Sequence, residues 1–141
     1  MKSIKAGLNA WLKAQSAIAA IVSTRIYLGT LPQKPTYPAL VYDLVSDVSL
    51  GHSHDGLVGP RAARFQIDGY ATNVAAVETL METVYAALAG YRGEMGDFLV
   101  DGAFDYGAGP DERFKDEATL RNVEGRSRDF RIHYRDGDSS P

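Results

Sequence analysis

His52, His54 and Asp55 lie within four residues, and their types come nearest to a metal site in this sequence. Two imidazoles and one carboxylate are ligands that zinc accepts. However, glycines flank these residues, the chain has no cysteine, and the only other histidine is the distant His133. A pliable loop holds no fixed ligand geometry, so the sequence argues against metal binding and we expect no cofactor.

Other residues could support catalysis, but their spacing is not specific. A catalytic carboxylate pair stays open as an alternative, because four acidic residues could meet in space: Asp101, Asp105, Asp111 and Glu112. Solvated loop acids are the commoner explanation. The Gly-Ala-Gly-Pro turn at 107–110 lacks the Gly-Lys-Ser/Thr ending of a phosphate loop, and no serine lies in a Gly-x-Ser-x-Gly elbow. We therefore predict that the protein is not an enzyme.

Charged residues of both signs alternate in the last third of the chain. Seven are basic: Arg113, Lys115, Arg121, Arg126, Arg128, Arg131 and Arg135. Eight are acidic: Asp111, Glu112, Asp116, Glu117, Glu124, Asp129, Asp136 and Asp138. With a formal net charge of -3 for the whole chain, there is no overall attraction for nucleic acid. An outward row of both signs suits a solvated surface, or a face that pairs with charges of another subunit.

Length and composition predict one domain. The chain has 141 residues, of which 45% are hydrophobic, enough for one compact core. We expect this domain to span residues 1–135 and residues 136–141 to form a disordered tail. The absence of cysteine excludes a disulfide scaffold. Asn9, Lys13 and Gln15 interrupt the apolar N-terminal windows, which argues against a signal sequence and a membrane span.

Hydrophobic periodicity predicts two helices. The first runs from about Ser3, a plausible N-cap, to Ile21, with Trp11 on its buried stripe. The second begins after Thr72 or Asn73 and ends near Gly90.

Four strands are predicted from residues that alternate between apolar and polar, at 40–50, 63–71, 95–104 and 127–134. Three prolines make 25–42 an extended connector, and 51–60 and 105–116 are predicted as long loops. The order α-β-β-α-β-β predicts an α+β fold with a mainly antiparallel four-stranded sheet and two helices packed on one face.

A collinear series of short motifs accompanies these elements. They are Arg-Ile-Tyr at 25–27, Leu-Pro-Gln at 31–33, Tyr-Pro-Ala-Leu-Val-Tyr at 37–42, Phe-Gln-Ile-Asp-Gly-Tyr-Ala at 65–71, Leu-Ala-Gly-Tyr-Arg-Gly at 88–93 and Arg-Asp-Phe-Arg-Ile-His-Tyr at 128–134. Together with the alanine-rich first helix, this series resembles the tail completion or tail terminator family of long-tailed bacteriophages and gene transfer agents. The resemblance extends from Ile4 to about Arg135.

This resemblance implies a structural virion protein with no catalytic residue. Such proteins form rings, typically hexamers, at the head-proximal end of the tail tube, where they end tube polymerisation and offer a joining surface to the head. The implied partners are further copies of the chain, the tail tube protein and the head connector or stopper protein. DNA passes only transiently through the lumen, and the virion is assembled in the host cytoplasm. Two alternatives remain: a head-side neck adaptor or stopper, and a small α+β ligand-binding or hydrolytic domain.

Contacts with these partners are expected on outward-facing sheet residues and on the long loops. Our interface hypothesis names Arg64, Asp68, Arg128 and Arg131 on the strands. The loop 51–60, with His52, His54 and Asp55, is expected to reach a neighbouring ring or the channel, as is the loop 105–116.

Overall fold

A computed structural model describes residues 3–50, 60–117 and 119–137. Its helices are α1 (Ile4–Ala14), α2 (Ser16–Val22) and α3 (Val74–Leu88). Its strands are β1 (Ile26–Leu28), β2 (Ala39–Ser49), β3 (Arg61–Ala71), β4 (Gly93–Met95), β5 (Phe98–Ala108), β6 (Glu112–Lys115) and β7 (Asn122–Asp136). None of the helices in the described ranges is long and apolar enough to cross a membrane.

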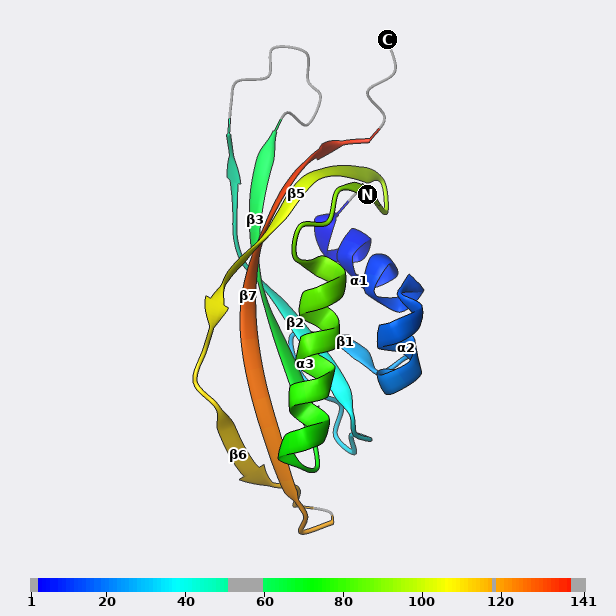
Figure 1. The fold of residues 1–141 in the computed structure, drawn as a ribbon, viewed down its shortest axis with the longest axis vertical. Helices are drawn as coiled ribbons and strands as arrows, with labels where there is room; N and C mark the ends of the chain where they lie inside the picture. Colours follow the sequence, from blue (N-terminus) through cyan, green and yellow to red (C-terminus); the bar gives the residue numbers. More distant parts are fainter. Residues whose placement is uncertain (1–2, 51–59, 118, 138–141) are drawn as a thin grey trace.

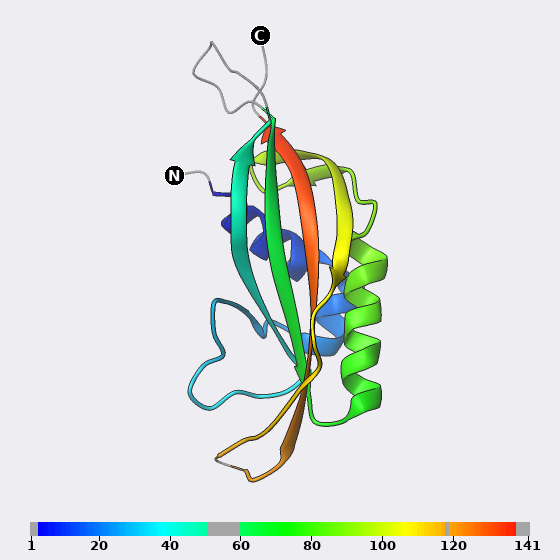
Figure 2. The same cartoon turned by 90° about the vertical axis from the view of Figure 1, so that its left-hand side faces the viewer.

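The seven strands form one curled sheet with the order β1-β2-β3-β7-β5-β4, and β6 pairs with β7 beyond the end of β5. Every pairing is antiparallel except that of β1 with β2. All three helices lie on one face of this sheet (Figure 1), and the opposite face is open to the viewer in Figure 2. The expected four-stranded, mainly antiparallel sheet with two helices is therefore wrong: the sheet is mixed and larger, and it carries three helices.

The first predicted helix is divided into α1 and α2. Ser3 caps α1 as expected, because its Oγ accepts a hydrogen bond from the Lys5 amide at 3.2 Å. At Gln15 the backbone turns extended, with ψ 112°, and this ends α1. The Gln15 side-chain amide then donates to the Trp11 carbonyl at 3.0 Å, which satisfies an acceptor that the helix end leaves open.

The second predicted helix is confirmed as α3. The Asn73 Oδ1 accepts from the Ala76 amide at 2.8 Å, which caps the first turn. Five apolar residues of one stripe are buried against the sheet: Val77, Leu80, Met81, Val84 and Leu88. This stripe fixes which face of α3 packs on β3 and β7.

Three short strands were not predicted: β1 inside the proline-containing connector, β4 before β5, and β6 inside the predicted loop 105–116. β1 and β4 have only three residues each, too few for an alternating pattern to show. All four residues of β6 are exposed, so no buried face marks it in the sequence. β6 is held in place by its antiparallel pairing with the first residues of β7, from Asn122 to Gly125.

The core lies between the helices and the inner face of β3 and β7. Phe65 and Phe130 face each other across these two strands, and both are fully buried. Trp11 belongs to the same core, as predicted, with its ring centroid 4.9 Å from that of Tyr91. Because alternate strand residues point to opposite faces, this core also decides which side chains reach the open face.

Candidate functional site

The open face of the sheet displays a polar row on β3. Phe65 and Ile67 point to the helices, so Arg64, Gln66, Asp68 and Tyr70 point away from them. On the neighbouring β7, the same face carries Arg131 beside Arg64, Asp129 beside Gln66 and Ser127 beside Asp68. We call this set of residues on β3 and β7 the outer face.

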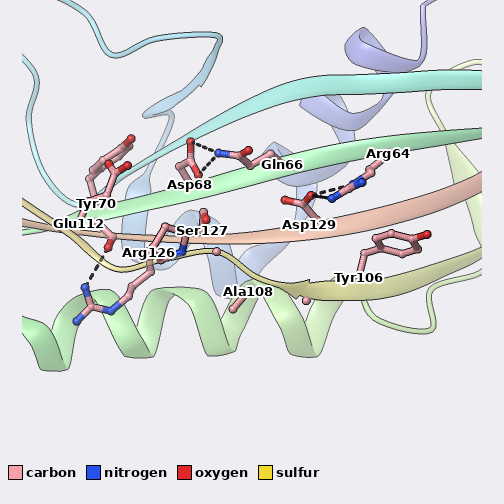
Figure 3. Close-up of a pocket in the computed structure, with 14 residues that line it drawn as sticks. Arg64, Gln66, Asp68, Tyr70, Tyr106, Ala108, Glu112, Arg126, Ser127 and Asp129 are labelled. Atoms are coloured by element: carbon pink, nitrogen blue, oxygen red, sulfur yellow. Dashed lines mark hydrogen bonds and ion pairs between the residues drawn. The ribbon is translucent and has the colours of Figure 1, made fainter.

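A cleft of about 260 Å³ is hollowed into the outer face, between these strands and the chain from Tyr106 to Pro110. Figure 3 shows its lining. At one end, two nitrogens of Arg64 bind one oxygen of Asp129 at 2.7 and 2.8 Å. The Arg64 guanidinium also lies 4.8 Å from the ring centroid of Tyr106. The contacts with Asp129 and Tyr106 together fix the positively charged guanidinium of Arg64 at that end of the cleft.

The other end of the cleft is acidic. The Gln66 amide donates to both oxygens of Asp68, at 3.0 and 3.3 Å. Burial raises the pKa of Asp68, and the negative charges of Asp43, Glu112 and Asp129 add to the increase. An uneven distribution of charge along one open face is suited to recognising a partner surface rather than to binding an apolar ligand.

Two tyrosines have raised pKa values: Tyr70, which lies beside Asp68, and Tyr134, which lies on the helix side of β7. Burial raises the pKa of Tyr70 to about 12, with a further contribution from the charge of Asp68. Burial also raises the pKa of Tyr134 to about 12, assisted by its hydrogen bond to Asp47 at 2.8 Å.

We predict that these two tyrosines make the protein sensitive to alkali. Because the folded state holds each phenol proton more tightly than the unfolded state, the free energy of unfolding keeps its full value below pH 10 and falls as pH rises towards 12. Urea unfolding across this range, with phenolate absorbance followed in parallel, measures the effect. The variant Tyr134→Phe should show a shallower decline. An equally steep decline in that variant would rule out a contribution from Tyr134.

The four strand residues of our interface hypothesis are divided between the two faces. Arg64, Asp68 and Arg131 lie on the outer face, and the Arg131 side chain has no hydrogen bond or ion pair within the described part of the chain. Arg128 lies on the helix side, since it stands opposite Ile67. Its Nη1 binds both oxygens of Asp105 at 2.7 and 2.8 Å, and its guanidinium lies 5.2 Å from the ring centroid of Tyr85. The expected outward register of Arg128 is thus wrong.

His52, His54 and Asp55 lie outside the described residues, so their proposed roles stay predictions. Among residues 3–50, 60–117 and 119–137, no three histidine or acidic side chains gather in a group that could hold a metal ion. Three acids of the possible catalytic group bind three different arginines of β7: Asp101 binds Arg135, Asp105 binds Arg128 and Asp111 binds Arg126. These acids are therefore engaged in structural ion pairs.

A buried ion network surrounds Arg126 and was not predicted from the sequence. Its side chain is only 8% exposed and lies 2.9 Å from Glu78 on α3 and 3.5 Å from Glu124 on β7. Glu124 is equally buried and also pairs with Arg113 of β6 at 2.8 Å. The alternating charges of β7 thus occupy both faces of the sheet. Val123, three residues before Arg126, is also fully buried, but strand alternation places it on the opposite face, so it gave no sign of this network.

Comparisons with known proteins identify the class. The model of one family, described as tail completion protein gp17, matches residues 6–123. This range is most of the chain, so the chain belongs to that family. Among solved structures, a chain of the virion of a native gene transfer agent particle has a similar fold, with a TM-score of 0.63 and 18% sequence identity over 96% of this chain and 99% of that chain. No curated protein matches the sequence.

The predicted resemblance is confirmed by the family match. The protein is a structural component of a virion tail, and this setting implies contact with other virion proteins.

Proposed function

We propose that this protein forms a homo-oligomeric ring, a hexamer, at the head-proximal end of the tail tube, where it ends tube polymerisation. The observation that carries the proposal is the family match over residues 6–123. In the virion the ring sits in the neck region, and assembly takes place in the host cytoplasm. Residues 1–135 act as the single ring-forming domain.

The shape of the fold supports this role. A sheet with all its helices on one face leaves the opposite face and parts of its edges for contacts with other molecules (Figure 2). The outer face offers Arg64, Asp68 and Arg131 for such contacts. One surface of the ring binds the tail tube protein and the other binds the head connector.

The charge of the chain suits a channel for DNA. With a formal net charge of -3, the ring has no general attraction for phosphates, so DNA passes through the lumen without being held. Binding of duplex DNA at submicromolar concentration and physiological salt would contradict this part of the proposal.

The proposal predicts that virions lacking this protein have tails of uncontrolled length. Without a terminator, tube subunits continue to add to the free end, so electron microscopy should show overlong tubes and few joined heads. Addition of the purified protein should restore uniform length and place a ring at the head-proximal end. Tubes of normal length in its absence would overturn the proposal. Copurification with filled heads, and not with tails, would instead indicate a head-side stopper.

A further inference from the structure

The sheet has two uncovered edge stretches on its opposite sides. β1 covers β2 only from Leu40 to Tyr42, and after that point no described strand pairs with β2 on the side away from β3. On the other side, β4 covers β5 only from Phe98 to Val100, and the Gly90 amide binds the Ala103 carbonyl. From Phe104 onward no strand of the described ranges pairs with β5 on the side away from β7. Uncovered strand edges are places where another chain can pair.

Both stretches expose large apolar side chains. Val45 and Val48 of β2 are 52% and 48% exposed. Phe104 and Tyr106 of β5 are 52% and 51% exposed. We call the first pair the β2 edge and the second pair the β5 edge. Apolar side chains at an open strand edge are expected to be covered in the assembled protein.

The two edges lie at the same level of the sheet. One row of registered residues runs across it, from Ser46 on β2 through Arg64 and Arg131 to Phe104 on β5. Three successive antiparallel pairings connect these strands, so β5 runs antiparallel to β2. A rotation about an axis along the strands therefore brings the β5 edge of one copy beside the β2 edge of the next, antiparallel and at matching height.

We propose that neighbouring subunits of the ring join head to tail through these edges, with Phe104 and Tyr106 of one copy packed against Val45 and Val48 of the next. The partner is a second copy of this chain. This inference rests on the proposed function, because it assigns the contact between subunits in the proposed ring. Each copy uses two different surfaces, so the contact repeats until the ring closes.

Two edge variants and their mixture test this proposal. Val48→Asp alters only the β2 edge, and Phe104→Asp alters only the β5 edge. Each variant alone should stay monomeric by light scattering and form no ring on tube ends. An equimolar mixture should give dimers and nothing larger, because one intact β2 edge meets one intact β5 edge. Dimer formation also demonstrates that both variants are folded.

Disulfide trapping provides a second measurement, since the natural chain has no cysteine. Adjacent strands hold facing Cβ atoms about 4.5–5.5 Å apart, near the span of a disulfide. Under mild oxidation, the double variants Ser46→Cys/Phe104→Cys and Ser46→Cys/Tyr106→Cys should yield a ladder of linked subunits that ends at the ring size. The matched control Ser46→Cys/Leu120→Cys should yield none, because Leu120 lies at the β6–β7 turn, away from both edges.

The outcomes separate this inference from the proposed function. Normal rings from either edge variant, or no ladder from both cysteine pairs, would overturn the edge contact while leaving the terminator role intact. If the unaltered protein forms no ring on purified tube ends, both proposals fail.

Discussion

Replacing Arg126 with methionine is expected to lower the free energy of unfolding by about 1.5–3 kcal/mol, because it removes charge-assisted hydrogen bonds to Glu78 and to the buried Glu124, which keeps only Arg113 as a partner. Arg126 and Glu124 are each only 8% exposed, and Arg126 also binds Glu78 of α3. Urea denaturation followed by the fluorescence of the single tryptophan, Trp11, measures the loss. Trp11 is a suitable probe because it lies in the core that α1 and the sheet share.

A matched control for this variant is Arg135→Met on the same strand. Arg135 pairs with Asp101 at 3.3 Å, but the two side chains are 43% and 47% exposed, so the loss should stay below about 1 kcal/mol. The double variant Arg126→Met/Glu124→Leu should recover part of the stability, because it also removes the buried acid whose charge Arg126 helped to balance. Equal losses for Arg126→Met and Arg135→Met would contradict the importance that we assign to the buried network.

Phe130→Ala is expected to cost more, about 3–5 kcal/mol, for a different reason. Phe130 has no exposed surface and stands opposite Phe65 at the centre of the sheet, so its truncation leaves a cavity that the rigid strands cannot close. Thermal and urea unfolding should both report the loss. A cost below about 1 kcal/mol would mean that this part of the core relaxes.

The control for Phe130→Ala is Phe114→Ala. Phe114 is 40% exposed on β6, where its main ring contact is with Tyr70, and its truncation should cost less than about 1 kcal/mol. All variants should be compared at concentrations that give the same oligomeric state, because assembly adds to apparent stability.

The residues Phe130 and Arg126 stabilise the part of the sheet that carries the proposed contact surfaces. The core around Phe130 and the network around Arg126 hold β7 in the middle of the sheet, between β3 and β5. β7 in turn sets the register of both neighbours, and so the positions of Arg64, Phe104 and the outer-face cleft. A structural protein of a virion tail needs such a rigid platform, because its contacts must repeat identically in every copy.

Features that depend on near neighbours in the chain could be predicted from the sequence. The Ser3 cap, the α3 stripe, the core position of Trp11 and the inward alternation of Phe65 and Ile67 follow from local spacing. The series of motifs also indicated the family, and that prediction is confirmed.

Features that depend on distant pairing could not be predicted. β6 is fully exposed and exists because Glu112–Lys115 pairs with Asn122–Gly125. Arg128 is a different case, because it was expected on the outer face although it lies two residues before the buried Phe130. Strand alternation alone therefore indicated the helix side, and its place opposite Ile67 agrees with this.

The sequence by itself therefore determined α3, the helical character of the N-terminal region, the main strands and the family, because the spacing of apolar residues and the short motifs are local properties. Only the tertiary structure decided the number of strands, the face on which each charge lies, and the common row of Ser46 and Phe104 that brings two open edges to one level. Those properties arise from backbone hydrogen bonds between segments that are distant in the chain, and local patterns carry no record of such pairing.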